Sequence, residues 1–261
     1  MSNKLIILGS GASPGVPSLS QGWGDCNPNN PKNRRLRTSV YLEYKGNKIL
    51  IDTSPDLREQ LLSHQINFLD GVIYTHPHAD HILGTDYLRE INRLTGKEIN
   101  IYGGEKTLSY LQTVFPHLVG ADFVTNRRYG ESLVPHIAKP YQVFMLNDVK
   151  IVPFEIYGHS EESLGYVFDD GEIVYISDFK EIDDKLFSLI KVKPKLLVIP
   201  LTTPYDQPRH AGLETILKYI DKIGAERVII NHMATECDFD FVDSATPENT
   251  SPAFDNLIIE F

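Results

Sequence analysis

Cysteine and long apolar runs are both scarce in this 261-residue sequence. Its two cysteines, Cys26 and Cys237, are too few for the disulfide framework of a small secreted protein. No apolar run approaches about 20 residues, the length that a transmembrane helix needs. The opening stretch, MSNKLIILGSG, has a short apolar run without a cleavage pattern, so we expect no signal peptide. These absences predict a cytoplasmic protein with no membrane partner.

Positive charge is also in deficit, because 25 Lys and Arg face 35 Asp and Glu and the formal net charge is −10. A protein that binds nucleic acid as its main partner needs a positive face for the phosphate backbone. The one local basic cluster is PKNRRLR, residues 31–37. The composition therefore favours a partner other than nucleic acid.

Short apolar segments alternate with helical patterns along the whole chain, without an internal repeat. This order predicts one α/β domain over residues 1–261, in which two sheets pack together with helices outside, rather than a doubly wound sheet. We expect helices over 54–64, 80–96 and 210–224, and a loop or mobile cover over 120–140. The expected strands are 4–8, 39–44, 47–52, 71–75, 99–103, 149–157, 164–169, 172–177, 195–200, 227–231 and 256–261.

Three histidines and an aspartate crowd the segment THPHADH, as His76, His78, Asp80 and His81. By chance, this pattern would arise in roughly one such chain in a thousand. A surface patch of histidines is the alternative. The position argues against it, because the segment follows an apolar strand and begins a helix, which would hold these side chains at the end of a sheet.

Imidazoles and carboxylates together are ligands for Zn, Mn or Fe. The alternate residues His76 and His78 can point to one ion, and Asp80 and His81 to a second. Three further candidates follow predicted strands: His159, Asp178 and His232. Taken alone, each of these three is more typical of a structural residue than of a metal ligand, but each stands where the two ions still require a ligand. The Asp178 carboxylate could bridge both ions.

These motifs resemble the metallo-β-lactamase superfamily in order and spacing, over essentially the whole chain. The segments GSGASPGVP, NPKNRRLRTS, IDTSPDLREQLL and PRHAGLETI are most similar to its PhnP-like phosphodiesterase branch. The resemblance implies an αββα sandwich with two divalent metal ions. It implies His76, His78 and His159 on one ion, Asp80, His81 and His232 on the other, and Asp178 between them.

The same resemblance implies that His210, in PRHAGLETI, faces the substrate as a general acid. A helix-capping histidine at the surface is the alternative. Asp80 and Asp178 would join His210 in the catalytic set. At His78, the flavodiiron relatives place Glu, so histidine there favours hydrolysis over redox chemistry.

The chain departs from the branch at a cysteine cluster that binds a structural zinc in several members. Here Cys26 stands alone in GWGDCNPNNPKNRR, and Thr235 stands where some relatives have a further histidine. We therefore expect two ions and no third, with Cys26 as a plain buried thiol.

Four more residues are candidates for the site. Asp52, in LIDTS, is expected to accept a hydrogen bond that orients a ligating histidine. Arg34, Arg37 and Ser10 are expected to bind substrate phosphate, although the arginines could equally form a solvated face.

The sequence thus predicts a dinuclear metal-dependent hydrolase. We expect a small or cyclic phosphodiester as substrate, attacked by a metal-bridged hydroxide while His210 protonates the leaving group. One alternative is a tRNase Z-like endoribonuclease, although no Gly/Pro-rich arm for holding tRNA is visible. The other is a non-catalytic metal-binding protein on the same fold. A homodimer is the alternative to a monomer for the oligomeric state.

Overall fold

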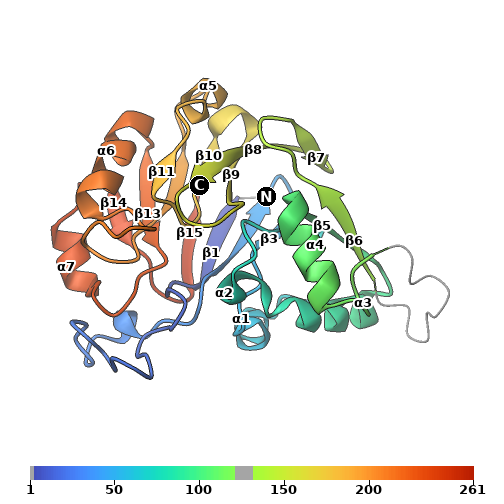
Figure 1. Ribbon diagram of the computed structural model, residues 1–261, viewed down its shortest axis with the longest axis horizontal. Coiled ribbons are helices and arrows are strands. Elements are labelled where there is room, and N and C mark those ends of the chain that lie inside the picture. The colour runs from blue at the N-terminus through green and yellow to red at the C-terminus, as the bar shows by residue number, and fades with distance from the viewer. Residues whose placement is uncertain (1–2, 121–131) are drawn as a thin grey trace.

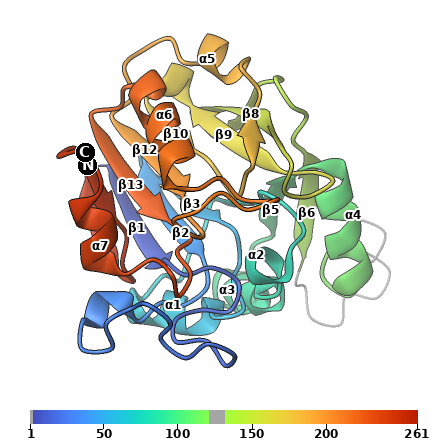
Figure 2. The same cartoon turned by 60° about the vertical axis from the view of Figure 1, so that its left-hand side comes forward.

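Two β-sheets lie face to face in a computed structural model that describes residues 3–120 and 132–261. Helices lie on the outer sides of the sheets (Figure 1), and a second view shows the same layers from the side (Figure 2). The predicted α/β sandwich is therefore confirmed. Within the described ranges, no helix is long and apolar enough to cross a membrane.

The first sheet has seven strands in the order β15-β1-β2-β3-β4-β5-β6. Strands β1, β2 and β15 pair antiparallel, whereas β3 to β6 run parallel. Parallel strands end at the same edge, so the residues that follow them are brought together. Its strands are β1 (Lys4–Gly9), β2 (Ser39–Tyr44), β3 (Asn47–Ile51), β4 (Gly71–Ile73), β5 (Ile99–Gly103), β6 (Leu133–Ile137) and β15 (Leu257–Glu260).

The second sheet follows the order β11-β8-β9-β10-β12-β13-β14, and β7 pairs with β8. Strands β10, β12, β13 and β14 are parallel, so this sheet also has an edge where several strands end. Its strands are β7 (Phe144–Leu146), β8 (Val149–Tyr157), β9 (Leu164–Phe168), β10 (Ile173–Tyr175), β11 (Glu181–Ile182), β12 (Leu196–Pro200), β13 (Arg227–Asn231) and β14 (Thr250–Pro252).

Apolar side chains fill two layers. One cluster lies between the sheets and continues under α6, and the other lies between the first sheet and α1, α3 and α4. Burying such surface is the main stabilising term in the fold. The α-helices are α1 (Leu57–Ser63), α2 (Ala79–Ile82), α3 (Leu88–Thr95), α4 (Glu105–Val114), α5 (Leu186–Leu189), α6 (Leu213–Ile223) and α7 (Phe239–Ser244).

Three predicted helices differ from the structure. The helix expected over 80–96 is broken into α2, a 3-10 turn and α3. At the break, a Cβ on Gly84 would lie 2.1 Å from the Ser54 carbonyl oxygen, so the chain passes too close to its neighbour for an unbroken helix with side chains. The helices expected from 54 and 210 begin only at Leu57 and Leu213.

The loop expected over 120–140 is wrong in part. Residues 133–137 form strand β6, which pairs with β5 at the edge of the first sheet. Its sequence, LVPHI, carries a proline and a histidine, and proline is tolerated at an edge strand because one side of it makes no ladder bonds. Residues 121–131 lie outside the described part of the chain.

Candidate metal centre

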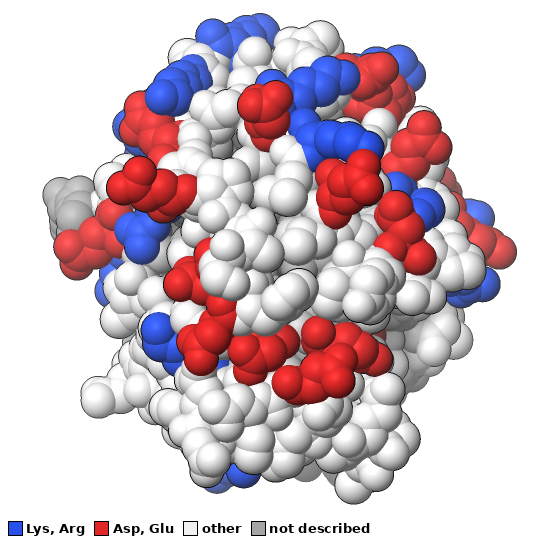
Figure 3. Space-filling model, turned by 90° about the vertical axis from the view of Figure 1, so that its left-hand side faces the viewer, with Lys and Arg blue, Asp and Glu red and all other residues white. Residues whose placement is uncertain are grey.

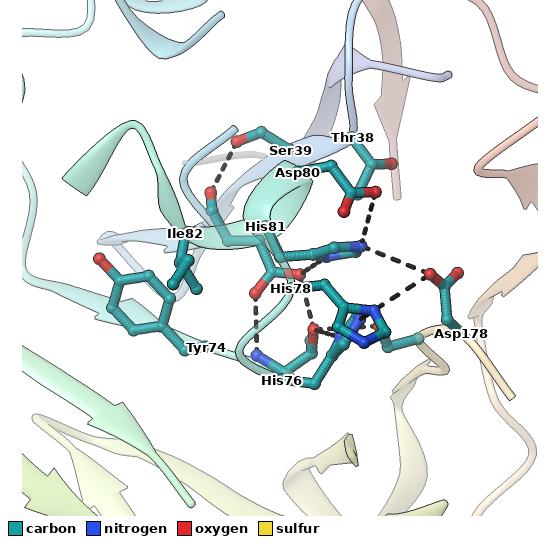
Figure 4. Close-up of polar contacts among 12 residues, drawn as sticks. Thr38, Ser39, Tyr74, His76, His78, Asp80, His81, Ile82 and Asp178 are labelled. Carbon is teal, nitrogen blue, oxygen red and sulfur yellow. Dashed lines mark hydrogen bonds and ion pairs between the residues drawn. The ribbon is translucent and has the colours of Figure 1, made fainter. Parts of the chain in front are cut away.

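All seven predicted ligands come together where strands of both sheets end. His76 follows β4, and His159 follows β8. Asp178 follows β10, and His232 directly follows β13. Figure 4 shows the His76, His78 and His81 rings turned toward the Asp178 carboxylate. Sequence spacing predicted which residues would gather here, and the structure gives their distances.

Three histidines form the first ligand group: His76, His78 and His159. His76 Nε2 lies 3.0 Å from His78 Nδ1, and His159 Nε2 lies 2.9 Å from the same Nδ1. Two of the three rings are buried and the third, that of His78, is partly buried. The three nitrogens converge on one point, as ligands of a single ion do.

The second ligand group comprises Asp80, His81, Asp178 and His232, and all four are buried. His232 Nε2 lies 3.3 Å from Asp80 Oδ2, and His81 Nε2 lies 3.5 Å from Asp80 Oδ2. Asp178 connects the two groups, because its Oδ2 lies 3.5 Å from His81 Nε2 and 3.6 Å from His159 Nε2. A carboxylate has two oxygens and can therefore serve both groups.

The donor set fits divalent metal ions. Two of its buried atoms, His81 Nε2 and Asp178 Oδ1, have no hydrogen-bond partner within the described residues. Buried polar atoms are rarely left in this condition, because an unmade hydrogen bond is costly. A cation between the imidazole nitrogens and the carboxylates would satisfy both atoms, and five histidines with two carboxylates suit Zn or Mn.

The two groups differ in how they hold protons. Burial lowers the pKa of His76 and His78, and it lowers the pKa of His159 to about 4. His81 is the exception: burial opposes its charge, but the Asp80 and Asp52 carboxylates hold its pKa well above the ordinary value. The first group therefore offers neutral imidazoles at neutral pH, whereas His81 carries a proton.

The aspartates of the second group stay ionised. Burial acts to raise the pKa of Asp178, but the adjacent His232 and His81 hold it well below its ordinary value. Burial also acts to raise the pKa of Asp80, but His81 and His232 outweigh it, so the pKa of Asp80 is lowered. Ionised carboxylates are the form that binds a metal ion.

Asp52 lies behind the ligands, as the sequence predicted. It is fully buried, and its Oδ2 lies 2.7 Å from His81 Nδ1. It also accepts hydrogen bonds from the Thr75 amide and hydroxyl, both at 2.8 Å, and that hydroxyl lies 3.0 Å from His76 Nδ1. One carboxylate thus orients a histidine of each group and leaves both Nε2 atoms facing the centre.

His210 lies at the same centre. Its ring centroid is 4.6 Å from that of His159, and one of its ring nitrogens lies within 4.8 Å of the ligand atoms of His159 and Asp178. Thr202 connects it to the ligands: Thr202 Oγ1 lies 3.0 Å from His210 Nδ1 and 3.2 Å from His232 Nδ1. Sequence reasoning missed Thr202, whose only signal was its position two residues after β12.

Glu162 is a second residue that sequence reasoning missed. Its carboxylate accepts hydrogen bonds from the amides of Lys106 and Thr107, at 3.1 and 2.9 Å, at the start of α4. The segment 158–163, which carries His159, is thereby attached to the helix. Gly158 allows the turn, because its φ is +79° and a Cβ would lie 2.7 Å from Lys180 Cβ.

The three predicted substrate-binding residues each contact other parts of the chain. Arg34 and Arg37 line a separate cavity of 770 Å³ that none of the seven ligands lines. Arg37 forms a two-atom ion pair with Asp56, at 2.6 and 2.7 Å, and the Arg34 guanidinium lies over the Trp23 ring. The Ser10 hydroxyl donates to Asp255. Each of the three therefore already has a partner, and substrate binding by them stays a prediction.

Cys26 is buried, as expected, and lies beside a buried arginine. Arg35 donates hydrogen bonds to the carbonyl oxygens of Ala234 and Cys237, at 3.2 and 2.8 Å, and approaches Cys26 Sγ at 3.7 Å. The Thr235 hydroxyl donates to Gln21. This loop is therefore fastened by hydrogen bonds, and the sequence did not indicate that Arg35 points inward.

Known proteins share both the sequence and the fold. Residues 47–233 match the family described as the β-lactamase superfamily domain. A crystal structure described as a new diphosphatase from the PhnP family superposes with a TM-score of 0.87 and 30% identity, covering 99% of this chain and 98% of that one.

Two curated relatives match over part of their length. An octanoyltransferase of Porphyromonas gingivalis is 30% identical over 233 residues, which make up 88% of this chain and 46% of that protein. A ribonuclease Z of Methanocaldococcus jannaschii is 26% identical over 194 residues, 73% of this chain and 51% of that protein. This chain spans about half the length of both. The family match, the near-complete superposition and the histidine–aspartate centre agree, and the chain belongs to the metallo-β-lactamase superfamily of hydrolases and, within it, to the PhnP family.

Proposed function

We propose that this protein is a dinuclear metal-dependent phosphodiesterase that acts on a small phosphodiester. One observation carries the proposal: Asp178 lies between two ligand groups, with His210 beside them. His76, His78 and His159 would hold one ion, and Asp80, His81 and His232 the other, with Asp178 shared. Bound there, two divalent ions of Zn or Mn would act as Lewis acids and lower the pKa of water.

The proposed task of His210 is proton transfer to the leaving group. In hydrolysis, a water oxygen forms a bond to phosphorus, the bond to the leaving alkoxide breaks, and that oxygen takes up a proton. Thr202 engages His210 Nδ1, so Nε2 is the nitrogen left to deliver the proton. Burial lowers the pKa of His210, which makes its imidazolium a more ready donor.

Two features favour a small substrate over RNA. The net charge is −10, and the face that α6 and α7 occupy carries a band of acidic side chains (Figure 3). Nonetheless, curated relatives include ribonuclease Z, so RNA cleavage is the second candidate. The PhnP-family relative is described as a diphosphatase. The oxygen bridge between two phosphorus atoms is therefore a second bond whose cleavage should be tested.

Replacing His210 tests the proposal. His210→Ala should keep both ions and slow alkyl phosphodiesters by about 10²–10⁴-fold, the usual contribution of a general acid. Nitrophenyl diesters should suffer far less, because nitrophenolate leaves without a proton. His117→Ala is the matched control, since His117 is exposed and pairs with Asp86 away from the centre.

The measurements are steady-state rates on both substrate types and metal content by mass spectrometry. Loss of an ion in His210→Ala would make His210 a ligand, and equal losses on both substrate types would remove it from the acid role. If the zinc- or manganese-loaded protein cleaved no phosphodiester at all, the proposed function would be wrong.

A further inference from the structure

A cavity of 670 Å³ opens beside the first ligand group. His78 and His159 line its inner side, next to the metal centre. Arg209 lines it as well, and Lys106 and Tyr110 line it from α4. A molecule in this cavity would touch the ligand residues at one end and α4 at the other, so the cavity can hold the part of a substrate that lies beyond the reacting phosphorus.

Arg209 brings a positive charge to this cavity. Its backbone carbonyl lies 3.3 Å from His159 Nδ1, which places the residue directly behind a ligand. Arg209 and His78 line the same cavity, so the guanidinium shares the cavity with that ligand too. The side chain is exposed, and no carboxylate of the described residues forms an ion pair with it.

The other charges of the cavity are engaged. Lys106 Nζ pairs with Glu161 at 2.8 Å, and the Glu162 carboxylate is bound to the amides of α4. Arg209 is therefore the cation that is available to a ligand. A guanidinium presents a planar fork of N–H groups that matches a phosphate in two-point contact.

Tyr110 adds an aromatic surface to the same cavity. It lies on α4 and is 50% exposed. Large aromatic side chains bury much apolar area when a ring stacks on them, and stacking on a base tolerates any base because each has a π face. The cavity thus offers a cation near the centre and an aromatic face further out.

We propose that this cavity is a subsite for a second phosphoryl group and a planar ring, so that the substrate is a small nucleoside-diphosphate-type molecule cleaved between its two phosphorus atoms. This inference rests on the proposed function. Arg209 would bind the phosphoryl group that leaves, and Tyr110 would stack on the ring attached to it.

The reaction balances without a further reactant. A water oxygen forms a bond to one phosphorus, and the bridging oxygen leaves with its electron pair on the other. A diphosphate esterified at both ends gives two phosphate monoesters, and one esterified at a single end gives a monoester and orthophosphate. The protons of the water pass to solvent as these products ionise. A leaving phosphate is a stable anion and, unlike an alkoxide, needs no proton to leave. The positive charge of Arg209 would stabilise this anion as it leaves.

The first test compares two substrates in the zinc-loaded enzyme. Arg209→Gln should lower kcat/KM for diadenosine diphosphate by about 10- to 100-fold, because a hydrogen bond to a charged group is lost. It should lower kcat/KM for bis(p-nitrophenyl) phosphate, which has no second phosphoryl group, by a much smaller factor. Arg227→Gln is the control, since Arg227 is exposed at the start of β13, the opposite end of that strand from His232.

The second test measures binding without turnover. In α,β-methylene-ADP a carbon replaces the bridging oxygen, so its Kd is accessible by calorimetry. Arg209→Gln and Tyr110→Leu should each weaken its binding by about tenfold or more. Methylenediphosphonate, which has no ring, should lose affinity in Arg209→Gln but not in Tyr110→Leu.

The outcomes separate the two proposals. Equal losses on both substrates in Arg209→Gln, or unchanged Kd values in both variants, would overturn the subsite. So would a wild-type enzyme that cleaves bis(p-nitrophenyl) phosphate but not diadenosine diphosphate, and the phosphodiesterase function would then stand alone. An enzyme that cleaves neither substrate would overturn the proposed function itself.

Discussion

Thr202 orients the His210 ring. Its Oγ1 lies 3.0 Å from His210 Nδ1 and 3.2 Å from His232 Nδ1, so one hydroxyl contacts both the proposed general acid and a ligand. His232 Nδ1 also lies 3.1 Å from Asp178 Oδ1. With its Nδ1 engaged by Thr202, the His210 imidazolium would deliver its proton from Nε2.

Thr202→Val should keep the shape of Thr202 and remove this link. We expect it to slow alkyl phosphodiesters by about 10- to 100-fold, part of what a general acid contributes, with less effect on nitrophenyl esters. Thr202→Ser keeps the hydroxyl and should retain most of the activity. The rates of both variants on both substrates provide the measurement, and a serine variant as slow as the valine one would contradict the link.

Proton release should distinguish the two metal sites at the residue scale. His76, His78 and His159 have lowered pKa values and are neutral at pH 7, whereas His81 has a raised pKa and is protonated. A metal ion binds the deprotonated imidazole. The first group should therefore take up zinc without releasing a proton, and the second should release one.

Calorimetry in buffers of different ionisation enthalpy measures this release. Chelator-treated protein should bind two zinc ions per chain, and binding at the second group should displace the proton of His81. Because that proton competes with zinc, affinity at the second group should fall about tenfold per unit of decreasing pH near neutrality, while affinity at the first group changes little. Two sites with the same pH dependence would show that His81 is neutral.

At the scale of elements, one contact ties a ligand loop to a helix. The segment after β8 carries His159, and Glu162 in the same segment accepts hydrogen bonds at the N-terminus of α4. A carboxylate is favourable there because the amides point outward and the helix dipole is positive. The position of His159 thus depends on α4, which packs on the far side of the first sheet.

Glu162→Ala should loosen this attachment and weaken zinc binding at the first group by about tenfold, the lower range for residues that orient a ligand. The unfolding free energy should fall by about 1 kcal/mol, as for a lost helix cap. Competition with a chelator and thermal unfolding measure the two effects.

Glu161→Ala is the matched control. Glu161 is the adjacent glutamate in the sequence, and its side chain is 86% exposed and pairs with Lys106. Zinc affinity should not change in this variant. An equal loss in both variants would assign the effect to local charge rather than to the cap.

At the scale of the whole molecule, charge limits the choice of partner. Asp25, Glu236, Asp238 and Asp240 line one cavity near α7. Figure 3 shows a band of acidic side chains on the face that α7 occupies. A phosphate backbone would be repelled there, and favourable binding requires Lys and Arg that release counterions.

We therefore expect weak tRNA binding, with a Kd above about 10⁻⁶ M at physiological salt, in the range of non-specific association. Electrophoretic mobility shift and cleavage of a tRNA precursor provide the measurement. Submicromolar affinity with specific cleavage at the 3′ end would favour the ribonuclease Z-like alternative instead.

The sequence alone determined the layered fold and which seven side chains gather. Strands such as 196–200, LLVIP, are continuous apolar runs, and such runs are identified locally because burial dictates their composition. The ligands follow strands or begin a helix, and His and Asp in that pattern have few other uses. The sequence predicted the ends of helices less well. The break at Gly84 arises because the backbone of Ser54 lies too close for a side chain, and such a neighbour is set by the fold.

Only the tertiary structure decided what surrounds the ligands. Thr202 meets His232 across 30 positions, and Glu162 meets Thr107 across 55. Arg37, expected at the substrate, lies instead against Asp56. A polar side chain takes whichever partner the packed chain brings within about 3 Å, and no local pattern encodes that distance. Burial makes a core residue recognisable in the sequence, whereas the partner of a polar residue is set by the fold.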